Sequence, residues 1–366
     1  MLFFSLWIIS LILCLLSSIF QKFERLIGLF TLIIFGIIEG NPNYLYGDAS
    51  VYYNDYFFKT QQFEKGYNYL TNFFGSYVDY QSFRLITSIF FMILLCVLLL
   101  LITEKISLFA LFYGIGAFPN DVQQVRNQMA AVFIVGAVVL LYKFNRKGII
   151  PAILTIYVGS LFHSIALLYL LFPIIFFFKD LNKGFKKISV LGLFIAIIVE
   201  LANNVLKLNN LVSNMLTRFS SRSSASTNVM DIYSNNLIPF SIWLLTFITT
   251  LIMICLVFLI NYKNNISVDD SKVEVIQKMA IGSLYIWMIG LILLASSIEY
   301  IRILRISSVI LFITIGKTIE LKKENLVLKN RLIVIGLLYS IILLILQAWI
   351  YYTNIENWFK ALNFIQ

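Results

Sequence analysis

The chain has 366 residues, of which 60% are hydrophobic and 13% charged, and its formal net charge at pH 7 is +10. A soluble domain usually carries about 25% charged residues, whereas here apolar runs of roughly 18 or more residues recur, each long enough to cross the hydrocarbon core of a bilayer. The composition therefore excludes a soluble protein, and in a membrane protein a basic surplus reports topology before it suggests nucleic acid, for which we expect no role.

The apolar runs predict an all-α, polytopic integral membrane protein that forms a single membrane domain over residues 1–366. We expect about twelve transmembrane segments, some of them short or re-entrant. They lie at 1–20, 26–40, 83–103, 106–118, 125–142, 149–160, 163–178, 188–203, 237–261, 279–298, 301–317 and 332–352. Residues 41–82 and 204–236 are predicted to be large extracytoplasmic loops.

The distribution of charge indicates which side of the predicted membrane domain faces the cytoplasm. With these segments, the surplus of ten positive charges falls on one side of the membrane, in the connections at 21–25, 104–105, 143–148, 179–187, 262–278 and 317–331. Cytoplasmic connections are enriched in lysine and arginine, so this side is predicted to be cytoplasmic. The opposite side has no net charge.

Residues that commonly hold metals are scarce and scattered. The chain has one histidine, His163, and three cysteines, Cys14, Cys96 and Cys255, each of which lies in an apolar run. Zinc sites need several imidazole or thiolate ligands close together. We therefore expect no metal site and no cofactor.

Ionisable groups inside or at the mouths of apolar segments are costly, so they are candidates for function. In the segment 41–82, Asp48 is followed by Tyr52, and Glu64 by Tyr67. Tyrosine rings stack on the C–H faces of sugars, and carboxylates accept hydrogen bonds from hydroxyls. The alternative is an interfacial aromatic belt with solvated charges.

A second polar group opens the predicted span 125–142. Arg126 lies near Gln124, and Asp121 is a candidate ion-pair partner for it. A guanidinium binds phosphate oxygens in a fork and keeps its charge, so a lipid pyrophosphate at headgroup depth would suit Arg126. The alternative is an arginine that extends to anionic headgroups.

Two further groups follow later in the chain. His163 is suited to proton transfer or to a hydrogen bond with a leaving phosphate, although a lone histidine at a helix start is often structural. Glu299, Arg302 and Arg305 are spaced three residues apart and would share one flank of a helix. They indicate either an anion-binding wall or an ion pair in which Glu299 neutralises an arginine.

Together, these segments resemble the EpsG/Wzy family of bacterial exopolysaccharide and O-antigen polymerases. The similar features, in chain order, are Gly47-Asp48 before tyrosines, Glu64-x-Gly66-Tyr67, Gln124-x-Arg126-x-x-x-x-Ala131, Phe162-His163-Ser164 and Arg302. Two positions depart from the family pattern. Members often have glutamine after the arginine, where this chain has Asn127, and proline after the histidine, where it has Ser164.

The resemblance implies a multi-pass membrane glycosyltransferase at the outer face of the bacterial cytoplasmic (inner) membrane. It would polymerise undecaprenyl-pyrophosphate-linked oligosaccharide repeat units into an exopolysaccharide or the O-antigen of lipopolysaccharide, and release undecaprenyl pyrophosphate. Membrane lipid and a chain-length regulator protein are the further partners that it implies.

The resemblance also suggests roles for the candidate residues. Arg126 and Arg302 would offset the charge of the leaving pyrophosphate, and His163 would bond to it, protonate it or act as a base. Asp48 or Glu64 would orient or deprotonate the acceptor hydroxyl. The remaining candidates for substrate binding are Arg305, Gln124, Glu299, Tyr52 and Tyr67.

Two other classes of function also fit a polytopic chain with charges at the mouths of its spans. One is a flippase or transporter of lipid-linked oligosaccharides, but transporters usually show internal repeats and charges at the membrane midplane. The other is an O-antigen ligase or a membrane acyltransferase, which would also use an arginine and a histidine beside a lipid-linked donor.

Overall fold

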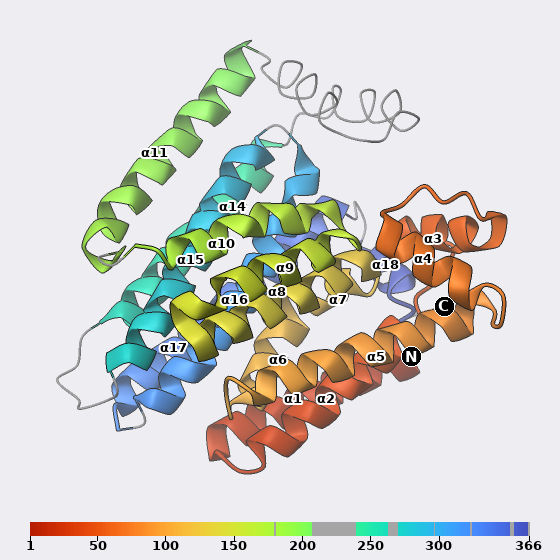
Figure 1. Ribbon diagram of the computed structural model, residues 1–366, viewed down its shortest axis with the longest axis horizontal. Coiled ribbons are helices and arrows are strands. Elements are labelled where there is room, and N and C mark those ends of the chain that lie inside the picture. Colours follow the sequence, from red (N-terminus) through yellow and green to blue (C-terminus); the bar gives the residue numbers. More distant parts are fainter. Residues whose placement is uncertain are drawn as a thin grey trace.

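The computed structural model describes residues 1–178, 181–206, 239–262, 270–295, 297–322, 324–351 and 355–364. Within these ranges the chain forms helices and no strands, which confirms the all-α prediction for them (Figure 1). The elements are α1 (Leu2–Phe20), α2 (Glu24–Glu39), α3 (Gly47–Phe58), α4 (Lys65–Phe74), α5 (Tyr80–Leu100), α6 (Ile106–Gly116), α7 (Phe118–Asp121), α8 (Val125–Phe144), η1 (Asn145–Gly148), α9 (Ile149–Ser160), η2 (Ser164–Leu170), α10 (Leu171–Ile175), α11 (Leu181–Leu206), α14 (Phe240–Asn261), α15 (Asp270–Leu294), η3 (Ile298–Tyr300), α16 (Ile301–Leu321), α17 (Leu326–Tyr351) and α18 (Ile355–Ala361).

Every apolar segment predicted from the sequence overlaps with a helix, and the segment 163–178 overlaps with η2 and α10. In the described part of the chain, six segments are long and apolar enough to cross a membrane. They are Leu2–Phe20, Tyr80–Leu100, Val125–Ser160, Phe240–Asn261, Lys272–Leu294 and Leu326–Trp349. The count of about twelve spans therefore stays a prediction.

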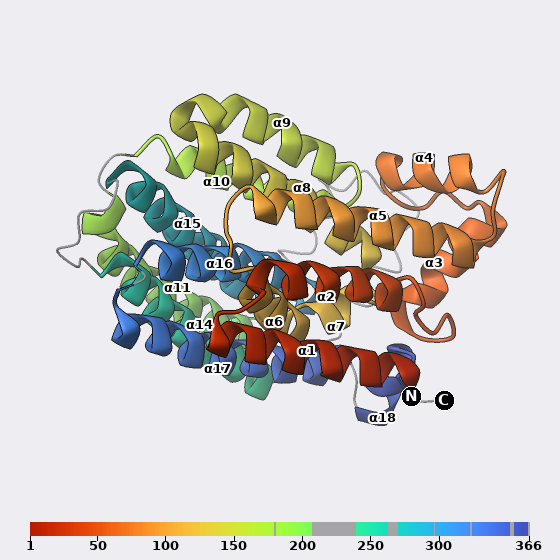
Figure 2. The ribbon, with the colours of Figure 1, turned by 90° about the horizontal axis from the view of Figure 1, so that it is seen from below.

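The segment 41–82, predicted to be an extracytoplasmic loop, contains the short helices α3 and α4, and its side of the membrane stays a prediction. Both helices lie at the same end of the molecule as the N-terminus and α18 (Figures 1 and 2). Tyr67 and Thr71 are buried and four residues apart, so they share the inner face of α4. This spacing of four residues is typical of a helix and is visible in the sequence. The other predicted loop, 204–236, lies almost wholly outside the described residues.

The centre of the molecule is formed by helices that are buried on nearly all sides. Within the most apolar window of each candidate span, 83% of the residues are buried in Val125–Ser160 and in Lys272–Leu294, but only 28% in α1. Along α16, nearly every residue from Ile301 to Ile319 is buried. Helices α8, α15 and α16 therefore form the core, and α1 presents an apolar face outward, as a lipid-facing helix does.

The path of the chain breaks inside this core, between α6 and α8. The connection at 117–124 is completely buried, and α7 is the one short helix within it. Polar side chains satisfy the backbone groups that the break frees: Gln347 donates to the Gly116 carbonyl at 2.5 Å, and Arg84 donates to the Val122 carbonyl at 2.7 Å. In an apolar interior, each such group left unsatisfied costs several kcal/mol.

One helix crossing in the core depends on a glycine. At Gly28 in α2, an added Cβ would lie 2.4 Å from the backbone carbonyl carbon of Ile106, at the start of α6. A side chain at this position would therefore push α2 away from α6. Gly184 in α11 is a matched contrast, because its nearest neighbour would be Ile188 Cδ1 at 3.7 Å.

We predict that Gly28→Ala lowers the thermal unfolding midpoint of the purified protein in detergent, because the new methyl group collides with backbone atoms. Gly184→Ala should leave the midpoint unchanged or raise it, since alanine favours a helix over glycine by about 1 kcal/mol. Equal midpoints for the two variants would contradict the close packing of α2 against α6.

Candidate functional site

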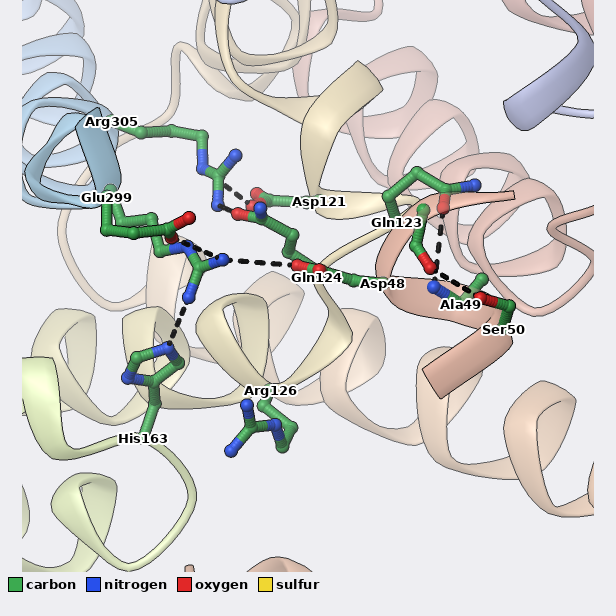
Figure 3. A network of polar contacts seen from close by, with 12 residues as sticks. Asp48, Ala49, Ser50, Asp121, Gln123, Gln124, Arg126, His163, Glu299 and Arg305 are labelled. Atoms are coloured by element: carbon green, nitrogen blue, oxygen red, sulfur yellow. Dashed lines mark hydrogen bonds and ion pairs between the residues drawn. The ribbon is translucent and has the colours of Figure 1, made fainter. Parts of the chain in front are cut away.

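The polar residues singled out in the sequence gather at the end of the molecule that carries α3 and α4. There the N-termini of α8 and α16 meet the connection between α9 and η2 (Figure 3). The side chains that converge are Asp48, Glu64, Arg126, His163, Glu299 and Arg302. Residues separated by as many as 254 positions in sequence are thus brought into contact.

Arg126 is paired with Glu64. Arg126 lies in the first turn of α8, Glu64 is the residue before α4, and their side chains form an ion pair in which they are 6% and 13% exposed. The second carboxylate oxygen of Glu64 accepts a hydrogen bond from the Ser164 backbone N–H at 3.1 Å. Glu64 therefore joins α4, α8 and the start of η2.

A close backbone approach holds Glu64 in this place. The Gly66 N–H donates to the Leu161 carbonyl at 2.8 Å. A Cβ at residue 66 would lie 2.7 Å from that carbonyl oxygen, which explains why the sequence has glycine two residues after Glu64. The contact fixes the start of α4 against the end of α9.

Aromatic rings surround the Arg126 guanidinium. Its central carbon lies 4.0 Å from the ring centroid of Phe63, 5.2 Å from that of Tyr52 and 5.9 Å from that of Tyr67. Such cation–π contacts stabilise the cation and shield it from water. Tyr52 and Tyr67 are only 3% and 0% exposed. Their rings therefore support Arg126 and offer no open face on which a sugar can stack.

Burial also affects the chemistry available to Tyr67. It raises the pKa of the Tyr67 hydroxyl well above the usual value for tyrosine. The phenol therefore stays protonated at neutral pH and cannot serve as a base.

A second and more open cluster surrounds Arg302. Its Nη2 lies 2.7 Å from a Glu299 carboxylate oxygen and 3.2 Å from an Asp48 oxygen, and the side chains of these acids are 34% and 35% exposed. The pairing of Glu299 with Arg302 agrees with their spacing in sequence. Asp48, from the first turn of α3, adds a contact that the sequence did not indicate.

His163 lies against the other side of Arg302. Its Nε2 is 3.4 Å from Arg302 Nη1, and its Nδ1 accepts a hydrogen bond from the Ile165 N–H at 3.3 Å. Because Glu64 binds the N–H of the next residue, Ser164, the connection 163–164 links the two arginine clusters. The result is one polar path that runs from Arg126 through Glu64 and His163 to Arg302.

Two predicted assignments change in the structure. Asp121 is not the partner of Arg126: it pairs with Arg305 at 3.0 Å, because α7 and the following turn direct it toward α16. Arg305 is 1% exposed and also donates to Gln124 at 2.5 Å. Arg305 and Gln124 are thus bound to each other inside the protein, whereas the sequence suggested that both bind substrate.

Sequence reasoning missed two residues that shape the site. Phe63, next to Glu64, supplies the ring closest to Arg126. Arg84 is completely buried and donates to the backbone carbonyls of Glu39 and Val122, which anchors the turn before α8. A signal for Arg84 was present, since a single charge at the start of an apolar run is costly and needs a partner.

Within the described part of the chain, no group of three or more histidine, cysteine, aspartate or glutamate side chains is arranged to hold a metal ion. The carboxylates of the site, which are the side chains that could bind a metal ion, are already paired with arginines. The chemistry that these residues offer is therefore recognition of anions together with acid–base transfer.

The family model for EpsG matches residues 43–364, which is most of the chain. No curated protein and no solved structure matches this chain. The matched region contains all of the converging side chains, from Asp48 to Arg302.

We predict that Glu64→Ala destabilises the protein far more than Glu299→Ala. Removing Glu64 leaves the buried charge of Arg126 without its carboxylate, a loss of about 3 kcal/mol in the free energy of unfolding. Arg302 is more exposed and keeps Asp48 when Glu299 is removed, so we expect a loss below about 1 kcal/mol.

Chemical unfolding of both purified variants in the same detergent would measure these differences. Similar losses of stability in the two variants would contradict the distinction between a buried and an open arginine cluster.

Proposed function

Because the chain belongs to the EpsG family, we propose that it is a membrane polysaccharide polymerase that joins undecaprenyl-pyrophosphate-linked oligosaccharide repeat units. Members of this family are generally associated with polysaccharide polymerase activity. In the proposal, the protein is a glycosyltransferase that works at the outer face of a bacterial cytoplasmic membrane. The six apolar helices support the membrane location.

The observation that carries the proposal is the polar path between Arg126 and Arg302. These arginines come from two different helices, and His163 and Glu64 lie between them. A pyrophosphate group presents several oxygens on two phosphorus atoms, and a guanidinium that exchanges its carboxylate for such oxygens can bind them in a fork. Fixed cations in a site that excludes water are efficient at stabilising the charge that develops on a leaving group.

The proposed reaction transfers the growing chain to the newest repeat unit. A hydroxyl oxygen of the acceptor attacks the anomeric carbon at the reducing end of the chain, and the bond from that carbon to the pyrophosphate oxygen breaks. The hydroxyl proton passes to a carboxylate base, and the pyrophosphate leaves on its lipid carrier. The donor is already activated, so the reaction needs no nucleotide sugar.

Exposure favours Asp48 over Glu64 as this base. The Asp48 side chain is 35% exposed, whereas that of Glu64 is 13% exposed and is engaged by both Arg126 and the Ser164 N–H. A general base must come within hydrogen-bond reach of the proton that it removes. Glu64 would then act by holding the Arg126 side chain in place.

The resting site is not positive overall. The carboxylates of Asp48, Glu64 and Glu299 outnumber the charges of Arg126 and Arg302. A pyrophosphate must therefore displace a carboxylate when it binds. Arg302 is the better place for this exchange because its acids are the more exposed, and an oxygen bound there would also be within reach of His163.

We predict that Arg126→Ala abolishes long chains and that lipid-linked single repeats accumulate. Arg126→Lys should also lose most activity, since lysine keeps the charge but not the fork. Arg25→Ala is the control: Arg25 pairs with Glu104, is 58% exposed, and lies in the first turn of α2, at the end of that helix that is far from α3.

Gel analysis of polymer length and of lipid-linked intermediates, at equal protein levels, would test this prediction. Full-length polymer from Arg126→Ala would overturn the role of Arg126. Loss of outward-facing units would favour a flippase instead, and polymer retained on its carrier would favour a ligase.

A further inference from the structure

Two arginines of α16 lie one turn apart in very different surroundings. The Arg302 side chain is 16% exposed and borders the open cluster, whereas that of Arg305 is 1% exposed. Both were candidates for substrate binding from their sequence spacing. This difference in exposure indicates that the two arginines have different roles.

Every nitrogen of the Arg305 guanidinium faces an acceptor inside the protein. Nε pairs with Asp121 at 3.0 Å, Nη2 donates to Gln124 at 2.5 Å, and Nη1 lies 3.5 Å from Gln347 Oε1. The Asn127 amide oxygen, in the orientation that its neighbours require, accepts from Nη2 at 2.7 Å and from Nε at 3.2 Å. A guanidinium that is enclosed in this way has no free edge for a substrate phosphate.

The acceptors of Arg305 are themselves held by neighbouring elements. Tyr113 of α6 donates its hydroxyl to Asp121 at 2.9 Å. Gln347 of α17 accepts from Asn120 at 2.8 Å and donates to the Gly116 carbonyl. Arg305 is therefore a polar contact point between α16 and the elements α6, α7 and α17.

This point lies close in sequence to both arginines of the proposed site. Arg305 follows Arg302 by one helical turn, and its acceptor Gln124 is the residue that precedes α8, two positions before Arg126. Figure 3 shows Arg305, Asp121 and Gln124 beside the cluster that includes His163 and Glu299. A shift of α16 against the start of α8 would change the separation of Arg302 and Arg126.

We propose that Arg305, through Asp121 and Gln124, is a positioning residue that fixes how Arg302 and Arg126 are placed relative to each other. This inference rests on the proposed function of those two arginines. Misplacement of reacting groups by about 1 Å can reduce a rate by about a hundredfold. A buried ion pair with further hydrogen bonds suits this task, because it allows few alternative geometries.

The test compares Arg305→Lys with Arg302→Lys, the same substitution one turn away. Lysine retains the charge but cannot bind Asp121, Gln124 and Asn127 together. For Arg305→Lys we expect kcat to fall about a hundredfold, with KM for a synthetic lipid-linked repeat unit changed less than about threefold. Arg302→Lys should raise KM about tenfold or more, because it removes a direct contact with the pyrophosphate.

A second measurement does not depend on activity. Hydrogen exchange should become faster in Arg305→Lys at residues 118–128 and 299–305, because local opening there loses its restraint. Arg302→Lys should leave exchange at 118–128 unchanged. Asp121→Asn, which keeps the shape of the side chain, should repeat the Arg305→Lys pattern and serves as the second variant if that protein does not fold.

The outcomes separate the competing roles. A raised KM with unchanged exchange in Arg305→Lys would show that Arg305 contacts substrate and would overturn the positioning role. If Arg305→Lys has the wild-type kcat per folded molecule, Arg305 contributes only to folding, and the positioning role would be overturned as well. If the wild-type protein makes no polymer, the proposed function fails, while the exchange measurement still decides whether Arg305 fixes α16 to α8.

Discussion

A chain that leaves its helix inside an apolar domain must find new hydrogen-bond partners for the backbone groups that it frees. In this protein the break between α6 and α8 imposes that constraint. Arg84 of α5 and Gln347 of α17 satisfy the carbonyls of Val122 and Gly116, and Arg305 of α16 neutralises Asp121. These contacts determine where α8 begins, and Arg126 lies in its first turn. The placement of the site therefore follows from the way in which the protein stabilises a broken helix.

The need to pair buried charges also determines the composition of the site. Arginines near an apolar core are stable only when they are paired, and here α3, α4 and η3 supply the carboxylates. Pairing stabilises the protein but leaves no positive surplus to attract an anion. The two clusters resolve this conflict differently. The enclosed Arg126 is held by Glu64 and three aromatic rings, while the more exposed Arg302 is paired with two acids, which phosphate oxygens would replace in the proposed function.

The sequence was sufficient to predict the helical segments and the side chains that converge, because both depend on local costs: apolar runs predict helices, and isolated charges within them need partners. It indicated the local pair of Glu299 and Arg302 but was insufficient to predict the long-range pairs. Glu64 and Arg126 are 62 residues apart, and Asp48 and Arg302 are 254 apart, so only tertiary packing brings them together. Asp121 was nearer to Arg126 in sequence but faces Arg305. Helices α3 and α4 were overlooked because their tyrosines and acids resemble those of an interfacial loop.

In the proposed function, this protein transfers a saccharide chain from a lipid pyrophosphate by using paired arginines. The most direct measurement is an assay of the purified full-length protein with synthetic undecaprenyl-pyrophosphate-linked repeat units. We expect polymer to form, with one carrier pyrophosphate released per linkage and without any nucleotide sugar. Units that remain single under these conditions, or a requirement for a nucleotide sugar, would contradict the proposed function.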